Sequence, residues 1–286
     1  MVPILEVTGL KKSHQNFMLR DVNFTVPEDC ITGFIGVNGA GKSTAIHSIL
    51  NLVQKDAGTI QFRGKDISKN EKAFKDKIGV VFDSGCFYEE LSLKEMTELI
   101  SSSYSHWNES AYKQYMDMFS LHPEQIVGTL SKGMKLKYSL ALALSHDTEL
   151  LIMDEPTSGL DPLMREQFLN ILKAYLEPGG RAVFYSTHIT ADLEKAADML
   201  IMIHNGAIIF EEEKDALLER FRIVKGDTRE LSPDMEPLML HFDKSSYGFT
   251  GITDKPEKLK QSGKDLLFER ATAEDIMLAY VKEREQ

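Results

Sequence analysis

The sequence contains only two cysteines, Cys30 and Cys86, among its 286 residues. Two isolated cysteines supply neither a disulfide framework nor the clustered thiolates of a structural zinc site. Sparse cysteine use is typical of proteins that stay in a reducing compartment. We therefore expect a cytosolic chain in which neither cysteine has a functional role.

Long hydrophobic runs are missing as well. A membrane-spanning helix needs about 20 predominantly apolar residues, and the nearest approach, residues 199–210, is interrupted by His204, Asn205 and Gly206. The N-terminal residues lack the basic leader, apolar stretch and cleavage site of a secretion signal. We expect a chain that does not cross a bilayer, so that any connection to a membrane requires a partner protein.

Positive charge is in the minority, because 33 lysines and arginines face 44 aspartates and glutamates, giving a formal net charge of −11. Binding to nucleic acid depends on neutralising backbone phosphates. We therefore expect no nucleic acid as the main partner. What is present is an ordinary globular composition, with 42% hydrophobic residues, enough for a sizeable core.

The order of strand and helix signals predicts an α/β fold. Continuous apolar runs, typical of buried parallel strands, occur at residues 31–35, 78–82, 150–153 and 182–185. Helical patterns lie between or beside them, at residues 43–53, about 84–145 and 162–176. Two β-rich runs, residues 4–7 and 22–26, predict an antiparallel edge. We expect a mostly parallel sheet core with an antiparallel β edge subdomain and a helical subdomain.

The same patterns predict three parts of the chain. A large domain covers residues 1–212 and includes the helical subdomain at about 84–145, a linker covers 213–225, and a small C-terminal α+β domain covers 226–286. The C-terminal part shows weak strand signals and a terminal helix from about Ala273.

A phosphate-loop pattern of glycine, four residues, glycine, lysine and a hydroxyl residue runs from Gly36 to Ser43. Its glycines let successive backbone N–H groups point into one concavity, and the following helix adds its positive end. Lys42 then reaches the β- and γ-phosphates, and the Ser43 hydroxyl takes Mg²⁺. The alternative, a plain glycine turn, is disfavoured because a strand and a helix flank the motif. The predicted nucleotide-binding residues here are Gly36, Asn38, Gly39, Ala40, Gly41, Lys42, Ser43 and Thr44.

Two further segments fit the same chemistry. The apolar run at 150–153 ends in Asp154 and Glu155, where Asp154 can join the magnesium shell and Glu155 can stand beside the attacking water. A buried strand that stops at a charged turn would look the same. Ser131 is placed to cap a helix whose N-terminus suits an anion, although a capped helix needs no ligand.

Four segments together resemble the ATPase subunits of ABC transporters. They are GVNGAGKST at 36–44, LSKGM at 130–134, LLIMDEPTSGLDP at 150–162 and STH at 186–188. Their order and spacing match the family over about residues 5–210. The resemblance implies a P-loop NTPase fold, ATP hydrolysis with Mg²⁺, and a head-to-tail dimer that sandwiches two ATP molecules. The implied partners are a second copy or a related ATPase subunit, and a separate transmembrane permease subunit.

The resemblance also implies roles for individual residues. Ser131 and Gly133 would contact the γ-phosphate held by the other subunit, and Asp161 would lie in the dimer interface. Glu155 would be the general base, and His188 would sense the γ-phosphate. A histidine that merely ends a surface strand is the alternative for His188.

Three positions depart from the family pattern. The pentapeptide is usually LSGGQ and here contains Lys132 and Met134, a change that we expect function to survive. Asp83 stands where a glutamine is usual and can still reach Mg²⁺ or its water shell. The adenine-stacking aromatic residue aligns with His14, with Phe17 as a nearby substitute, and the alternative is that neither stacks.

The chain most resembles bacterial exporters of the ABC-2 type, which move peptides, antimicrobials or drugs and whose ATPase is a separate polypeptide. We expect residues 83–93 to lie near the permease, at the cytoplasmic face of the cell membrane. Two alternatives remain at this point. A soluble ABC ATPase of translation or DNA repair would have two cassettes or long coiled coils, and a small-molecule kinase would have no use for LSKGM.

Overall fold

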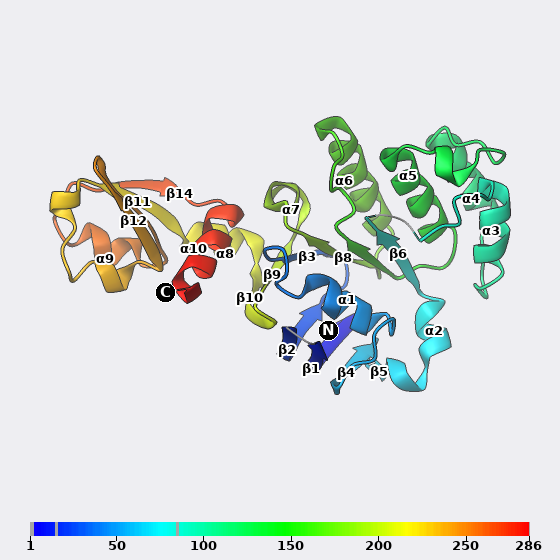
Figure 1. Cartoon of the computed structure of the whole chain (residues 1–286), viewed down its shortest axis with the longest axis horizontal. Coiled ribbons are helices and arrows are strands. Elements are labelled where there is room, and N and C mark those ends of the chain that lie inside the picture. The colour runs from blue at the N-terminus through cyan, green and yellow to red at the C-terminus, as the bar shows by residue number, and fades with distance from the viewer. Residues whose placement is uncertain (1–2, 15–16, 84–85, 286) are drawn as a thin grey trace.

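The computed structural model describes residues 3–14, 17–83 and 86–285. Its centre is a six-stranded sheet with strand order β10-β9-β3-β8-β7-β6 (Figure 1). The strands are β3 (Ile31–Ile35), β6 (Ile78–Phe82), β7 (Leu150–Asp154), β8 (Ala182–Thr187), β9 (Met199–His204) and β10 (Ala207–Glu213). All are parallel except β10, which pairs antiparallel with β9. β3, β7 and β8 are buried at every residue, which explains why their sequences are apolar without alternation.

A second, antiparallel sheet has the order β2-β1-β4-β5. It consists of β1 (Leu5–His14), β2 (Phe17–Val26), β4 (Ala57–Phe62) and β5 (Lys65–Asp66). Phe24 of this sheet packs on Phe34 and Phe184 of the central sheet, with ring centroids 5.5 and 5.3 Å away. This aromatic contact joins the two sheets into one core on the side that also carries α1 (Lys42–Ile49).

Helices cover the other face of the central sheet and form a lobe beside it (Figure 1). They are α3 (Leu93–Ser101), α4 (Glu109–Met118), α5 (Lys132–Ala143), α6 (Pro162–Leu176) and α7 (Thr190–Ala196). Helix α2 (Glu71–Lys75) lies instead beside the antiparallel sheet, where the ring of Phe74 contacts that of Phe62 in β4. Thr97, Tyr112 and Tyr138 join α3, α4 and α5 through buried hydroxyl hydrogen bonds of 2.8 and 2.9 Å. These hydrogen bonds tie α5 to α3 and α4 and so orient its N-terminus.

The C-terminal part is a small sheet of order β12-β13-β11-β14 with its own apolar core. Its elements are α8 (Lys214–Arg220), β11 (Arg222–Gly226), β12 (His241–Ser245), β13 (Gly248–Thr253), α9 (Pro256–Lys260), β14 (Leu267–Arg270) and α10 (Ala273–Glu285). α10 returns to the large lobe, where Tyr280 contacts the rings of Phe210 and Phe221. Short 3₁₀ turns complete the chain at Ile67–Lys69, Val127–Thr129, Thr228–Glu230 and Glu236–Leu238.

The structure differs from the expected linker at residues 213–225. This segment contains helix α8 and nearly all of strand β11, which lies between β13 and β14 in the C-terminal sheet. The local pattern is weak because the strand is stabilised by pairing with residues 249–253 and 267–270, far away in sequence.

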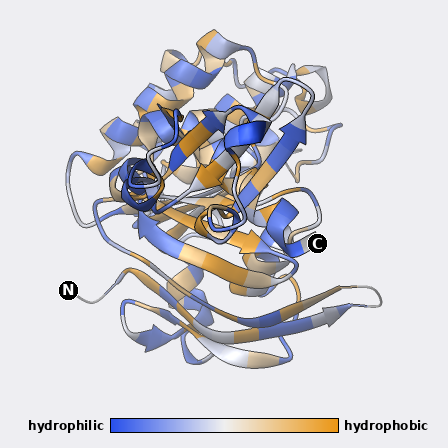
Figure 2. Cartoon of the chain, turned by 90° about the vertical axis from the view of Figure 1, so that its left-hand side faces the viewer, coloured by the Kyte–Doolittle hydropathy of each residue, from blue (hydrophilic) through white to orange (hydrophobic). Residues whose placement is uncertain are grey.

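Hydrophobic residues concentrate on the central strands, whereas the helices and loops around them carry many hydrophilic residues (Figure 2). Within the described ranges, no helix combines the length and the apolar character that crossing a membrane requires.

Candidate nucleotide-binding site

The phosphate loop occupies the turn between β3 and α1, where close packing demands glycine at two positions. Gly41 has φ +114°, and a Cβ there would lie 2.6 Å from the ring of Phe17. A Cβ on Gly36 would lie 2.4 Å from the carbonyl oxygen of Ile203. The loop is thus pressed against strands β2 and β9. No acidic residue occupies the first turn of α1, so the positive end of this helix is free to attract an anion.

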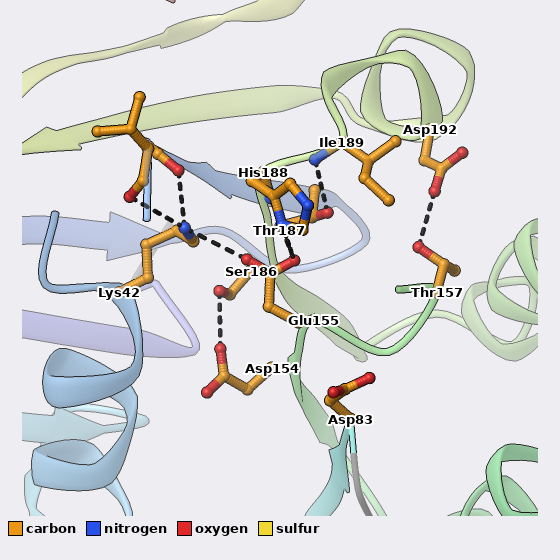
Figure 3. A network of polar contacts seen from close by, with 12 residues as sticks. Lys42, Asp83, Asp154, Glu155, Thr157, Ser186, Thr187, His188, Ile189 and Asp192 are labelled. Carbon is orange, nitrogen blue, oxygen red and sulfur yellow. Dashed lines mark hydrogen bonds and ion pairs between the residues drawn. The ribbon is translucent and has the colours of Figure 1, made fainter. Parts of the chain in front are cut away.

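Lys42, the first residue of α1, points back into this loop (Figure 3). Its side chain is only 6% exposed, and Nζ donates a hydrogen bond of 2.7 Å to the carbonyl oxygen of Gly36. Nζ also lies 3.2 Å from Oε1 of Glu155. A buried ammonium group needs such partners. The lysine is therefore held ready at the place where the motif requires a phosphate.

Glu155 follows β7 directly and is held in a strained backbone conformation with φ +52°. Its amide donates to the carbonyl oxygen of Ser186 at 2.9 Å. The other carboxylate oxygen, Oε2, is hydrogen-bonded to Nδ1 of His188 at 2.7 Å and accepts from the His188 amide at 3.2 Å. Lys42, Glu155 and His188 therefore form one connected chain of polar contacts (Figure 3).

Asp154, the last residue of β7, is buried beside this chain. Its Oδ1 accepts a hydrogen bond of 2.9 Å from the Ser186 hydroxyl. No lysine, arginine or histidine of the described residues forms an ion pair with it. A buried carboxylate without a cation is an unusual arrangement, because burial penalises the charged form. Asp154 is accordingly a candidate ligand for a metal ion. Ser43, the other candidate, directly follows Lys42 in α1 and is exposed.

The residues expected to act across a dimer lie at the starts of α5 and α6. Ser131 caps α5, accepting a hydrogen bond of 3.3 Å from the Met134 amide, and Asp161 caps α6 in the same way at 2.9 Å. The two helix starts are neighbours, because a Cβ on Gly133 would lie 3.2 Å from Met164. In the described part of the chain, no hydrogen bond or ion pair connects them to the phosphate loop.

The two aromatic candidates for adenine stacking face each other near the tip of the β1–β2 hairpin. His14 and Phe17 are register partners, and the ring of Phe17 lies next to Gly41 of the phosphate loop. His14 is exposed, whereas Phe17 is partly covered. The geometry therefore favours Phe17 over His14 as the residue beside a bound nucleotide.

Asp83 lies just beyond β6 and forms an ion pair with Lys132 of the LSKGM segment. No described contact joins it to Ser43 or Asp154. Its predicted role as a ligand to Mg²⁺ stays a prediction, with one carboxylate oxygen already engaged by the lysine.

A buried network next to the site could not be read from the sequence. Thr157 donates a hydrogen bond of 2.7 Å to Asp192, and its hydroxyl lies 2.6 Å from that of Tyr185. Burial raises the pKa of the Tyr185 phenol well above its ordinary value, so this hydroxyl stays protonated. The network ties the loop after Glu155 to helix α7 after His188. Thr157 belongs to the LLIMDEPTSGLDP segment, but nothing in the sequence pairs it with Asp192, which lies outside every recognised motif.

Comparisons with known proteins agree with this geometry. A family model described as ABC transporter matches residues 19–158. The bacitracin transport ATP-binding protein BcrA of Bacillus licheniformis is 32% identical over 272 residues, covering 92% of this chain and 88% of that protein. The lantibiotic transport ATP-binding protein SrtF of Streptococcus pyogenes is 33% identical over 217 residues, covering 74% and 92%. A solved structure of an ATP-binding subunit of an ABC transporter matches with a TM-score of 0.68 at 29% identity, covering 76% of this chain and 92% of that one. The chain therefore belongs to the ABC transporter family, as an ATP-hydrolysing subunit that powers transport through a separate membrane component.

Proposed function

We propose that two copies of this chain, or one copy and a related ATPase subunit, close head to tail around two ATP molecules. The observation that carries the proposal is the division of the site into two halves on one subunit. One half contains Lys42, Glu155 and His188, and the other contains the capped helix starts at Ser131 and Asp161. Since no hydrogen bond or ion pair among the described residues joins the second half to the first, a neighbouring molecule is the natural source of its phosphate.

Binding of ATP would rearrange the polar chain at the phosphate loop. The γ-phosphate competes with Glu155 for Lys42, because both are anions that seek the same buried ammonium group. Glu155 is then released from the lysine but keeps its hydrogen bond to His188, which holds the carboxylate in one orientation. A carboxylate freed in this way can accept a proton from the attacking water, as a general base does.

Mg²⁺ fits the residues present. Asp154 offers a buried carboxylate without a cation partner among the described residues, and Ser43 offers a hydroxyl, both hard oxygen donors of the kind that Mg²⁺ selects. These two residues would hold the ion. When bound, it neutralises negative charge on the phosphates during transfer.

If each ATP site is built from two subunits, mixing two differently defective variants should restore activity. Lys42→Ala disables the phosphate loop and Ser131→Arg disables the capped helix, so each variant alone should be inactive. Mixing equal amounts should restore about a quarter of the wild-type turnover, because half of the dimers are mixed and one of their two sites is intact. Steady-state phosphate release measures this. Absence of any recovery would contradict a site built from two subunits.

We further propose that the membrane component docks in a groove of about 670 Å³ between the end of α1, helix α2 and strand β6. Its lining combines apolar residues with both acidic and basic ones, which suits an amphipathic helix of a permease. The apolar lining residues include Leu50, Leu52, Val80 and Phe82, and the charged ones include Glu71, Lys72, Lys75 and Asp76. The groove ends next to Asp83, in agreement with the expectation that residues 83–93 lie near the permease. The chain would then lie at the cytoplasmic face of the membrane.

Docking of the permease in this groove can be tested at Leu52, because its side chain is 61% exposed and can be changed without disturbing the core. Leu52→Glu should abolish copurification with the permease while ATP binding and the melting temperature stay unchanged, since a charge cannot be buried against an apolar helix without cost. Leu267→Glu is the matched control, because Leu267 is a leucine of similar exposure, 58%, on the C-terminal sheet. Equal copurification of the two variants would place the permease elsewhere.

The names of similar proteins suggest the class of compound that is transported. The names of two similar proteins concern transport of bacitracin and of a lantibiotic. We infer export of an antimicrobial compound of that kind, and expect that deleting the gene lowers resistance to it. If the deletion strain has an unchanged inhibitory concentration for both compounds, this substrate assignment is wrong, and the assignment of ATPase activity is unaffected.

A further inference from the structure

Two of the positions at which the chain departs from its family's motifs contact each other. Lys132 in the LSKGM segment forms an ion pair with Asp83, which follows strand β6. The lysine also lies beside the loop after Glu155, since its Nζ is 3.7 Å from the place where a Cβ of Gly159 would be. Side-chain exposure is 42% for Lys132 and 45% for Asp83, so the pair is open to solvent on the single subunit, next to Ser131, which the proposed dimer would cover.

Lys132 occupies an electrostatically unfavourable place. It is the first residue of α5, directly after the cap Ser131, and the N-terminal end of a helix repels cations. The first turn of α5 contains no acidic residue that would offset this. Asp83, from a different segment, supplies the missing negative charge. The site around Lys132 therefore favours an anion through both the lysine and the helix.

The next lysine along α5 already has an anionic partner. Lys135, one turn further along α5, pairs with Glu89 at 2.9 Å. Lys132 is thus the basic residue that flanks Ser131 and Gly133, the two residues assigned to the γ-phosphate of the neighbouring subunit. Its long flexible side chain allows the ammonium group to serve either Asp83 or that phosphate.

We propose that Lys132 changes partners when the dimer closes, leaving Asp83 of its own subunit and binding the γ-phosphate of ATP on the neighbouring subunit. Asp83 then acts as a competitor that sets the ATP concentration needed for closure. This inference rests on the proposed sandwich dimer. The exchange is favourable because an exposed ion pair contributes little, whereas a charge-assisted contact to a phosphate inside an interface that excludes water is stronger.

The exchange also gives Asp83 a role that differs from metal binding. Asp83 directly follows Phe82 in the chain, and Phe82 lines the groove assigned to the permease. A permease segment that shifts this stretch would change how strongly Asp83 retains Lys132. Docking and closure would thereby be linked through one ion pair.

The test uses ATP-driven dimerisation of the full chain carrying Glu155→Gln, which holds ATP without turnover. Sedimentation velocity gives the ATP concentration at half-dimerisation. Asp83→Asn should lower this midpoint about twofold to fivefold, because Lys132 loses a competitor that holds it only through an exposed ion pair, and Lys132→Gln should raise it about tenfold. The double variant should behave like Lys132→Gln, since Asp83 acts only through the lysine. The matched controls are Lys135→Gln and Glu89→Gln, from an ion pair that also joins α5 to the segment before α3, and both should leave the midpoint unchanged.

Several outcomes would overturn the proposal. A higher or unchanged midpoint for Asp83→Asn would show that Asp83 does not compete for Lys132. An unchanged midpoint for Lys132→Gln would exclude contact with the phosphate. ATP affinity at protein concentrations too low for dimerisation should stay equal in all variants, because the lysine acts across the interface. If the Glu155→Gln parent itself stays monomeric with ATP, the proposed sandwich dimer is refuted. If the parent dimerises but Asp83→Asn does not lower the midpoint, only the proposed exchange of partners by Lys132 is refuted.

Discussion

Glu155→Gln should slow ATP hydrolysis by about 10²-fold to 10⁴-fold while ATP binding persists, the loss that follows removal of a general base. The amide keeps the size of the side chain but cannot accept a proton from water. It also cannot form the ion pair with Lys42, now 3.2 Å from the carboxylate. ATP should therefore enter the loop with one competitor fewer, and the closed dimer should accumulate.

Single-turnover hydrolysis and size-exclusion chromatography with ATP measure the two effects of this variant. Glu149→Gln is the matched control, because Glu149 precedes the same strand β7 at its opposite end and pairs with Arg63 and Lys77. It should keep its turnover within about twofold, as expected for a surface ion pair remote from the chemistry. Unchanged turnover in the Glu155 variant would remove this residue from its assigned role.

Lys42→Ala should weaken ATP binding by roughly a hundredfold or more, since charge-assisted contacts to phosphate oxygens contribute about 1.5–3 kcal/mol each and 1.4 kcal/mol is a factor of ten. The lysine is nearly buried and already directed into the loop by its hydrogen bond to the Gly36 carbonyl, so a phosphate that displaces Glu155 meets an ammonium group that is already in place. Isothermal titration with ATP measures the loss, and circular dichroism with a melting curve checks the fold.

Lys77→Ala separates this effect from a general loss of stability. Lys77 is another ion-paired lysine, with contacts to Asp147 and Glu149 at the far end of the sheet. Its removal should lower the melting temperature slightly and leave ATP affinity intact. Equal ATP affinity for wild type and Lys42→Ala would refute the placement of the phosphates in this loop.

Much of the candidate site could be predicted from local sequence. The glycines of the phosphate loop are dictated by backbone geometry, and the structure gives the reason at Gly41, where a positive φ and the neighbouring ring of Phe17 both exclude a side chain. The buried strands were equally readable, because β3, β7 and β8 have no exposed face and hence no polar alternation. Helix α6 begins at Pro162 behind the cap Asp161, as its sequence indicates.

The C-terminal part was less readable. Strand β13, at Gly248–Thr253, and strand β11 gave no clear signal, and the expected linker proved to be structured. Gly248 and Gly251 weaken the β pattern locally. These strands form because each finds a partner far along the chain, and cross-strand contacts rather than intrinsic preference decide such pairings.

By itself, the sequence determined the phosphate loop, the acidic pair after β7 and the parallel core, because each depends on residues that are neighbours in the chain and on the geometry that they impose locally. Only the tertiary structure decided which distant groups meet. It placed Asp83 against Lys132, Thr157 against Asp192, and Lys42 against Glu155. Such contacts arise from the packing of whole elements, and no local spacing encodes them.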